Sequence, residues 1–253
     1  MTARNPAPAW YVISLRPRGG NASLRRAAAR HGAGLLALAP WKLETVDSVE
    51  SRAALDQALA ADRLMFTSPE AARSAAKLRE LRAMPGQAWF AVGSGTAAAL
   101  RRVGVADVVA PTRMDSEGLL ALPGLQHLHG STIGLVTAPG GRGTLPPALA
   151  ARGAKLIRAN VYQRVPVVPS PRALAAVHNL KVPGVLAVSS GEALQLTLQR
   201  LPAAVVERLR ALPAVAASAR LVELARDSGF STCRQARSAR PADMIEAAAQ
   251  LMA

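Results

Sequence analysis

Residues 12–34 read VISLRPRGGNASLRRAAARHGAG, and residues 133–155 read IGLVTAPGGRGTLPPALAARGAK. Both stretches contain a short apolar run, a loop in which Pro precedes Gly-Gly, an amphipathic Ala-rich helix and a final Gly-Ala. Gly32 and Gly153 follow these helices, where glycine can take the left-handed conformation that ends a helix. The chain therefore contains an internal repeat of a strand–loop–helix unit.

The similarity continues downstream in the same order. The segment LMFTSPEAARSAAKLREL (64–81) parallels LAVSSGEALQLTLQRL (186–201), and WFAVGSGTAAALRRVGV (89–105) parallels AVAASARLVELARDSGF (214–230). DSEGLLAL (115–122) parallels PADMIEAA (241–248), each at a predicted helix start. Repeated strand–helix units predict parallel sheets flanked by helices, so we expect an α/β fold of two similar doubly wound, flavodoxin-like domains.

Two Pro-bearing stretches interrupt the pattern at corresponding points of the repeats, residues 36–46 and 155–168. Their extended character predicts a two-stranded antiparallel β linker that the chain crosses twice. We therefore expect one discontinuous domain from residues 1–38 plus 167–253 and a second domain from residues 48–157. Residues 39–47 and 158–166 would form the linker.

The loops that follow the paired strands are rich in Gly, Ser, Thr and Pro. In doubly wound sheets ligands bind at the carboxyl ends of strands, where helix N-termini offer free N–H groups to anions. These loops therefore predict a site for carboxylates or phosphates. They span residues 16–21, 67–70, 93–96, 137–144, 189–192 and 217–220.

The composition restricts the function. The formal net charge of +15 attracts anions, but the arginines are scattered and aromatic residues make up only 3% of the chain, so stacking platforms for nucleic acid are mostly missing. The single Cys233 and the absence of zinc-like Cys/His spacing fit a reducing cytoplasm and predict no metal. The N-terminus lacks the apolar core of a signal peptide, and no apolar run has the ~20 residues of a membrane span.

A dinucleotide site is one alternative. Gly93, Gly95 and Ala98 fit G-x-G-x-x-A, and Asp115 stands near the acidic position of that fingerprint. A true fingerprint opens the first strand of its domain, whereas this motif lies inside a repeat whose partner, Ala-Ser-Ala-Arg, has lost both glycines. We therefore expect no nicotinamide or flavin cofactor.

Several motifs, taken in order, resemble the uroporphyrinogen-III synthase family. They are FTSPEAA, AVGSGTAAAL, SEGLLAL, TAPGGRGTLPPALAARGA, VYQR, SSGEAL and SARLVELARDSGF, spread from about Val12 to Ala248. The resemblance implies a cofactor-free cyclising lyase of tetrapyrrole biosynthesis. Such an enzyme closes hydroxymethylbilane, a linear tetrapyrrole with acetate and propionate arms, with loss of water and inversion of ring D. The family binds the tetrapyrrole between two domains joined by a β-ladder.

The resemblance also implies a site. Tyr162 matches the tyrosine of the VYQR motif, and a phenol can act as general acid for the departing hydroxyl. Carboxylate contacts are expected from arginines and backbone N–H groups in the strand-end loops. The residues expected to bind substrate are Arg16, Thr67, Ser68, Gly93, Thr96, Arg142, Ser189, Ser190, Ser218 and Arg220.

Alternatives remain open at this stage. Each hydroxyl residue could simply cap the following helix, and each arginine could be a solvated surface charge. From another class, the chain could be a non-catalytic two-domain binder of an anionic small molecule. We expect a cytoplasmic monomer whose partner is a small-molecule substrate, with neither nucleic acid nor membrane.

Overall fold

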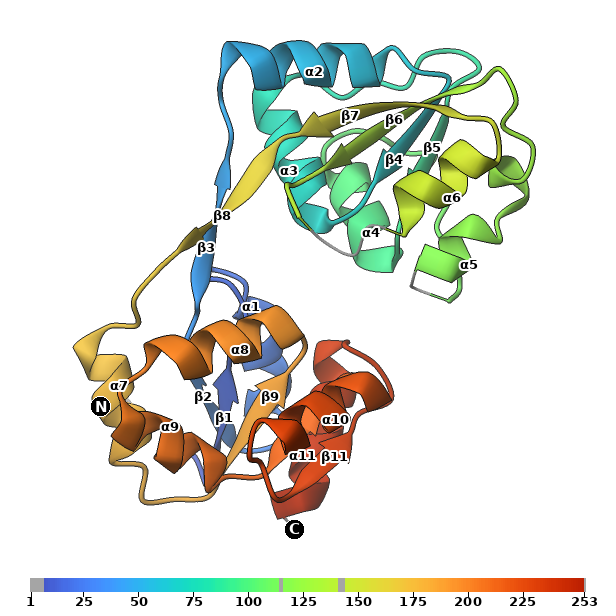
Figure 1. Ribbon diagram of the computed structural model, residues 1–253. Helices are drawn as coiled ribbons and strands as arrows, with labels where there is room; N and C mark the ends of the chain where they lie inside the picture. Colours follow the sequence, from blue (N-terminus) through green and yellow to red (C-terminus); the bar gives the residue numbers. More distant parts are fainter. Residues whose placement is uncertain (1–6, 114–115, 141–143, 253) are drawn as a thin grey trace, which may run out of the picture. The chain divides into compact units, whose positions relative to one another are not determined.

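The computed structural model describes residues 7–113, 116–140 and 144–252. The chain forms two compact units (Figure 1). Unit 1 comprises Met1–Lys42 and Val165–Ala253, and unit 2 comprises Leu43–Arg164. Unit 1 is therefore built from both ends of the chain, and unit 2 from its middle.

Unit 1 contains a five-stranded sheet in the order β11-β10-β9-β1-β2, in which every neighbouring pair is parallel. The strands are β1 (Trp10–Ser14), β2 (Ala33–Ala37), β9 (Gly184–Val188), β10 (Ala214–Ala216) and β11 (Cys233–Gln235). The helices are α1 (Ala22–Ala29), α7 (Pro171–His178), α8 (Gly191–Arg200), α9 (Ala203–Arg210), α10 (Ala219–Asp227) and α11 (Pro241–Met252).

Unit 2 contains a parallel sheet in the order β5-β4-β6-β7, extended by a parallel bridge between Phe90 and Val109. The strands are β4 (Arg63–Phe66), β5 (Ala88–Ala91), β6 (Thr132–Thr137) and β7 (Lys155–Asn160). The helices are α2 (Val49–Leu59), α3 (Pro69–Leu78), α4 (Ser94–Arg102), α5 (Ser116–Leu120), the short 3₁₀ helix η1 (Pro123–Leu125) and α6 (Leu145–Ala151).

The two sheets share one topology, and the sequence repeat predicts their register. Ile13 pairs with Leu186 and Leu36 in unit 1, and its repeat partner Gly134 pairs with Leu64 and Ile157 in unit 2. Leu64 and Leu186 are themselves repeat partners, as are their next neighbours, Trp89 and Ala214. Unit 1 has the strand order of flavodoxin, 2-1-3-4-5, when its strands are counted from β1. The predicted doubly wound α/β fold is confirmed.

Each unit takes a strand–helix–strand segment from one repeat, β1-α1-β2 in unit 1 and β6-α6-β7 in unit 2, and its remaining strands from the other repeat. β1 and α1 join β9 and β10 in unit 1, whereas β6 and α6 join β4 and β5 in unit 2. Gly32 and Gly153 have φ values of 68° and 88°, the left-handed geometry expected where α1 and α6 end.

A two-stranded ladder of β3 (Trp41–Thr45) and β8 (Tyr162–Pro166) contains both chain crossings between the units. Its ends are closed by backbone hydrogen bonds from Val46 to Val161 and from Val167 to Pro40, both 3.0 Å. These pairings run in opposite directions, so the ladder is antiparallel, as predicted. Residues 158–160, expected in the linker, instead complete β7, because their backbone continues the parallel pairing with β6. In the repeat, Trp41 and Tyr162 occupy equivalent positions, each as the first residue of its ladder strand.

The cores are made mainly of Ala, Leu and Val, with a few large aromatic side chains. In unit 2, Phe66 and Trp89 stack with ring centroids 5.4 Å apart. Gly134 on β6 allows α2 to approach closely, because a Cβ there would lie 2.1 Å from the carbonyl oxygen of Ala58. In unit 1, β1 and β9 are buried between α1 and α11 on one face and the other helices on the opposite face (Figure 1).

Candidate active site

The carboxyl ends of β4, β5 and β6 lie at one edge of the sheet in unit 2, because these strands are parallel. The strand order reverses between β4 and β6, and such a reversal is where doubly wound sheets bind ligands. The hydroxyl of Thr67 donates to the hydroxyl of Thr137 at 2.8 Å. This hydrogen bond joins the two strand ends across the reversal.

Tyr162 brings a phenol to Ser68, the next residue after Thr67. The Tyr162 hydroxyl lies 3.0 Å from Ser68 Oγ. Ser68 is the N-cap of α3, and its Oγ also accepts a hydrogen bond from the backbone N–H of Ala71 at 3.0 Å. The Tyr162 side chain is only 7% exposed and its ring belongs to the hydrophobic cluster of unit 2. The ring position is therefore fixed by packing and the hydroxyl position by hydrogen bonding.

The hydrogen-bonding capacity of this pair is compatible with proton donation by the phenol. Ser68 Oγ accepts from Ala71 and keeps both a hydrogen and a second lone pair, so it can donate to the Tyr162 oxygen or accept from it. When Ser68 donates, the phenol keeps its hydrogen for another acceptor. The same serine hydrogen bond would stabilise the phenolate that remains after the proton has left. The arrangement can therefore act as a general acid.

Gly93 and Thr96 stand at the start of α4, directly after β5. Gly93 is the N-cap, and its carbonyl oxygen accepts from the backbone N–H of Thr96 at 3.0 Å. Thr96 is only 2% exposed. The structure therefore places Thr67, Ser68, Gly93 and Thr96 at the same strand edge, and Ser68 is the one hydrogen-bonded to Tyr162. Arg142 and Asp115 lie outside the described residues.

Unit 1 has a different set of polar groups at the corresponding edge. The hydroxyl of Ser14 donates to Asn21 Oδ1 at 2.7 Å and accepts from the backbone N–H of Arg16 at 3.2 Å. The half-buried Arg16 donates through Nη2 to the carbonyl oxygen of Ala239 at 3.0 Å. Burial lowers the pKa of the Arg16 guanidinium below its ordinary value. Arg16 thus ties the first loop to the segment before α11.

The remaining expected residues of unit 1 follow β9 and β10. Ser190 caps α8, where its Oγ accepts from the backbone N–H of Ala193 at 3.3 Å, and Ser189 precedes it. Ser218 is the N-cap of α10 but its side chain makes no capping hydrogen bond. Arg220, in the first turn of α10, is exposed. These four residues share the strand edge of unit 1.

Sequence reasoning did not single out Thr137, Ser14 or Asn21. Thr137 fell within a loop expected to bind anions, and its repeat partner is Arg16. The repeat therefore pointed to Thr137, because its register places Thr137 and Arg16 at equivalent positions, each at the end of the strand beside the reversal. Asn21 likewise lies in a loop expected to bind anions, residues 16–21, whereas Ser14 gave no signal, since its hydrogen bond to Asn21 depends on the loop conformation.

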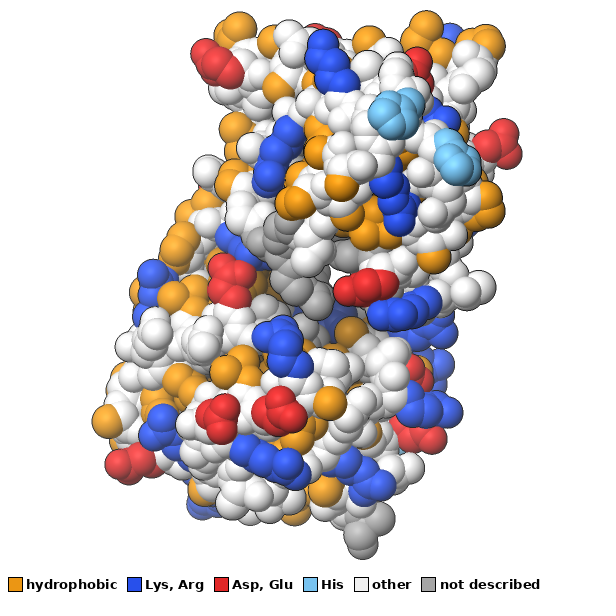
Figure 2. Space-filling view, turned by 45° about the vertical axis from the view of Figure 1, so that its right-hand side comes forward, with side chains coloured by type: hydrophobic (Ala, Val, Ile, Leu, Met, Phe, Trp, Pro, Cys, Tyr) orange, Lys and Arg blue, Asp and Glu red, His pale blue; other side chains and the backbone are white. Residues whose placement is uncertain are grey.

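On the face drawn in Figure 2, Lys and Arg side chains occur on both units, together with acidic, uncharged and apolar groups. Among the described residues, no group of three or more His, Cys, Asp and Glu side chains could hold a metal ion. Within the same residues, no helix is both long and apolar enough to cross a membrane.

The chain thus has two flavodoxin-like units that are related by an internal repeat and joined by a two-stranded ladder. Both units carry hydroxyl groups at their strand ends. These features define a class of duplicated two-domain α/β proteins. Residues 22–246 match the model of a family described as uroporphyrinogen-III synthase HemD. The chain belongs to the uroporphyrinogen-III synthase family, which confirms the resemblance found in the sequence.

Individual relatives agree with this assignment. Uroporphyrinogen-III synthase from Escherichia coli (strain K12) is 32% identical over 153 residues, and that from Salmonella typhimurium (strain LT2) is 34% identical over the same length. Each match covers 60% of this chain and spans 62% of the relative's length.

Solved structures share the fold. A mutant uroporphyrinogen III synthase from the extremely thermophilic bacterium Thermus thermophilus matches with a TM-score of 0.62 and 19% identity, over 97% of this chain and 100% of that one. Uroporphyrinogen-III synthetase from Helicobacter pylori 26695 matches with a TM-score of 0.64 and 14% identity, over 95% of this chain and 99% of that one.

Proposed function

We propose that this protein is a uroporphyrinogen-III synthase, which cyclises hydroxymethylbilane to uroporphyrinogen III with inversion of ring D. Family membership supports the reaction class. The observation that carries the proposal is the Tyr162–Ser68 hydrogen bond of 3.0 Å beside the strand reversal of unit 2. It supports the proposal because a phenol, which can act as a proton donor, lies at an edge where α/β sheets bind ligands.

Tyr162 is the proposed general acid for departure of the terminal hydroxyl. The carbon–oxygen bond of the hydroxymethyl group breaks, its electron pair stays on oxygen, and the Tyr162 proton completes a water molecule. The remaining azafulvene is attacked by the substituted carbon of ring D to give a spiro intermediate, which rearranges. The closed ring finally loses a proton, which restores the phenol, so the net change is loss of one water.

The carboxylate arms of the substrate are proposed to bind at the strand ends through backbone N–H groups, hydroxyls and arginines. Helix N-termini are suited to this because their free N–H groups and dipoles attract anions. α3, α4, α8 and α10 each begin at such an edge. The proposed substrate-binding residues are Arg16, Thr67, Ser68, Gly93, Thr96, Arg142, Ser189, Ser190, Ser218 and Arg220.

The test is to supply freshly prepared hydroxymethylbilane and separate the oxidised products by chromatography. The type III isomer in excess over the enzyme-free control is the expected result. Type I alone reflects spontaneous closure and would contradict the proposal. Saturable binding of the tetrapyrrole without turnover would support the non-catalytic anion binder instead.

We further propose that the protein acts as a monomer in the cytoplasm without a cofactor. The single cysteine and the scattered charge support this assignment. Sedimentation of the purified protein at micromolar concentration, with and without tetrapyrrole, checks the oligomeric state.

A further inference from the structure

A pocket of about 630 Å³ lies in unit 1, and none of the proposed substrate-binding residues lines it. Its walls come from the loop after β1, the first turn of α1, the end of β2 and the start of α7. Ala22, Ala37 and Ala39 contribute small side chains that leave the space open. The volume falls within the ~300–1,000 Å³ range of small-molecule sites.

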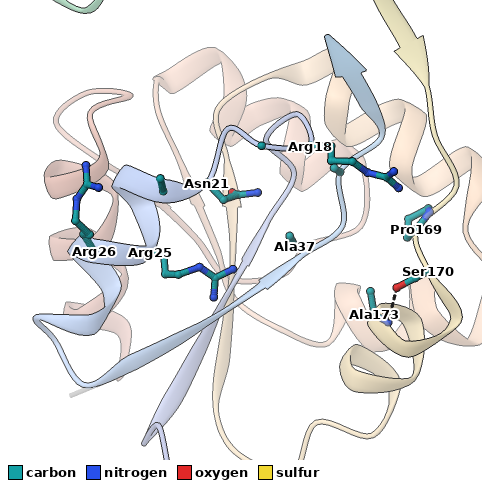
Figure 3. A pocket seen from close by; sticks show the side chains of 11 residues that line it. Arg18, Asn21, Arg25, Arg26, Ala37, Pro169, Ser170 and Ala173 are labelled. Atoms are coloured by element: carbon teal, nitrogen blue, oxygen red, sulfur yellow. Dashed lines mark hydrogen bonds between the residues drawn. The ribbon is translucent and has the colours of Figure 1, made fainter. Parts of the chain in front are cut away.

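Two guanidinium groups border this space. Arg18 and Arg25 line the pocket, and both are exposed. Within the described parts of the chain, neither forms an ion pair with a carboxylate. The Arg18 backbone N–H donates to the carbonyl oxygen of Trp41 at 2.9 Å, which fixes the loop. Figure 3 shows Arg18 reaching toward Pro169 and Arg25 toward Ala37, while Arg26 points away.

Asn21 supplies a neutral donor between these two arginines. Its side chain is 9% exposed, and its Oδ1 is occupied by the Ser14 hydroxyl at 2.7 Å. This hydrogen bond fixes the amide so that the NH₂ group faces the pocket, on the side of Arg18 in Figure 3. An NH₂ group can only donate. The pocket therefore presents a held donor between two cations.

The chemistry of the lining selects an anionic ligand. Arg recognises carboxylates and phosphates through paired N–H donors, and the N-terminus of α1 adds further positive potential. Among the described residues that line the pocket, there is neither an acidic side chain to repel an anion nor an aromatic side chain to stack a nucleotide base.

We infer that this pocket binds the acetate and propionate carboxylates of one pyrrole ring of the substrate. The inference rests on the proposed function, because that function supplies a ligand bearing two carboxylates on each ring. The pocket lies beside β2, on the other side of β1 from the strand reversal of unit 1. It is a subsite for holding the substrate rather than for the bond-making steps.

The test compares wild-type protein with the double variant Arg18→Gln/Arg25→Gln. A hydrogen bond to a charged group is worth enough to change binding about tenfold, so the double variant should raise the KM for hydroxymethylbilane by about tenfold or more. Its kcat should stay within about twofold of wild type. An unchanged KM, or a fall in kcat alone, would overturn the inference.

A charge-matched control is Arg30→Gln/Arg200→Gln. Both arginines are exposed in unit 1, outside the pocket, and stand at the ends of α1 and α8. This variant loses the same two charges, so it reports the general electrostatic attraction of the substrate. If its KM rises as much as that of the pocket variant, a specific subsite is contradicted.

Asn21→Asp is a second, nearly isosteric variant. The aspartate keeps an oxygen for Ser14 but replaces the NH₂ donor by a negative oxygen facing the pocket. We expect weaker substrate binding than in wild type, with a thermal melting curve that shows a folded protein. A folded variant with wild-type KM would exclude the amide as a carboxylate donor.

A binding assay separates failure of the inference from failure of the proposed function. Quenching of tryptophan fluorescence by uroporphyrin III, which carries eight carboxylates, is measured without turnover. If wild type makes no type III isomer, the proposed function fails. Weaker uroporphyrin binding by the pocket variant than by its control still supports a carboxylate site, and equal binding overturns it.

Discussion

The strand edges of units 1 and 2 have the same topology but different chemistry. In unit 2, Tyr162 donates to or accepts from Ser68 at the start of α3. The repeat partners in unit 1 are Trp41 and Ser190, and Ser190 caps α8 as Ser68 caps α3. An indole N–H cannot deliver a proton as a phenol can. A duplicated backbone position thus carries a candidate acid in one unit and a packing residue in the other.

Arginines of the first loop and helix occur in unit 1, and their repeat partners in unit 2 are uncharged. Arg16 lies in the loop after β1 of unit 1, and its repeat partner in unit 2 is Thr137, whose hydroxyl is hydrogen-bonded to that of Thr67. Arg18 and Arg25 of unit 1 correspond to Pro139 and Pro146. Under the proposed function, unit 2 would supply the phenol that donates the proton, and Arg18 and Arg25 of unit 1 would hold substrate carboxylates. Site chemistry can diverge in this way while the sheet registers stay the same.

The largest expected effect comes from removing the phenol hydroxyl that distinguishes unit 2 from unit 1. Tyr162→Phe removes the proposed acid while keeping the ring in the core, so kcat should fall by about 10²-fold or more. Trp41→Phe changes the equivalent position of unit 1 and should leave kcat much closer to wild type. Product chromatography over time gives both rates. Full activity in Tyr162→Phe would exclude the phenol as acid.

A control for the phenol substitution is Tyr11→Phe. Tyr11 is the other tyrosine of the chain, on β1 of unit 1. Its kcat should be unchanged. Thermal melting of all three variants shows whether any loss of activity reflects unfolding.

The next effect concerns packing. Gly134→Ala puts a methyl group 2.1 Å from the Ala58 carbonyl oxygen, so α2 must shift and the free energy of unfolding should fall by about 1–3 kcal/mol. The partner position in unit 1 holds the buried Ile13, so the close helix approach is particular to unit 2. Urea unfolding measures the change.

Gly95→Ala is the matched control for packing. The nearest atom to a Cβ at Gly95 is Pro69 Cγ at 3.7 Å, an ordinary contact. A helical Gly-to-Ala change stabilises by roughly 0.5–1 kcal/mol. Equal destabilisation of the two variants would mean that the α2 approach is not the cause.

A smaller effect separates the two serine caps. Ser68→Ala and Ser190→Ala each remove a capping acceptor, worth about 1 kcal/mol of stability. Ser68→Ala also removes the hydrogen bond to Tyr162, so it alone should lower kcat. Parallel melting and activity measurements make the distinction. Equal losses of kcat in both variants would contradict the proposal that only Ser68, through its hydrogen bond to Tyr162, supports the chemical step.

The smallest effect is a pH dependence of unit 2. Hydrogen bonds from Arg52 and Arg79 hold the pKa values of Asp47 and Asp56 below their usual range. A lowered folded pKa stabilises the folded state above the unfolded pKa of ~3.9, and this contribution is lost as the pH falls through the folded pKa. Both pairs are exposed, so the contribution is small.

The variant Asp47→Asn/Asp56→Asn removes these titrations but keeps both arginines, which also donate to the carbonyl oxygen of Leu78. Its melting temperature should lie below wild type at neutral pH and approach it below about pH 3. If the melting temperatures of the variant and wild type differed by the same amount at all these pH values, the lowered pKa values of Asp47 and Asp56 would not contribute to stability.

Sequence patterns predicted the fold because the repeat has a nearly fixed spacing. Ile13 and Gly134 lie 121 residues apart and pair with equivalent neighbours, so alignment of the repeats already contains the sheet register. The end of β7 was less predictable, because residues 158–160 suit either a sheet strand or a ladder. Element boundaries depend on which partner supplies the hydrogen bonds, and the sequence does not contain that choice.

The sequence predicted the kind of site, a set of polar groups at strand ends, better than it predicted the individual contacts. Ser68 and Tyr162 both carried signals, a helix cap and a family motif, but their 3.0 Å contact depends on how β8 leaves β7. Arg18 lies in the predicted anion-binding loop 16–21, but neither it nor Arg25 stood out as a residue, since one arginine looks like any other in a chain with 31 basic residues. What sets Arg18 and Arg25 apart is the orientation of the loop around Asn21.

The interleaving of the repeats has a consequence for biosynthesis. β1 is a central strand of unit 1, yet its neighbour β9 begins roughly 170 residues later. Unit 2 is continuous and can fold as soon as it leaves the ribosome, whereas β1, although β2 follows it at once, must wait on the order of ten seconds for its other partner, β9. During that interval an apolar N-terminal segment is a natural client for chaperones. We therefore expect the speed of translation to affect the yield of folded protein.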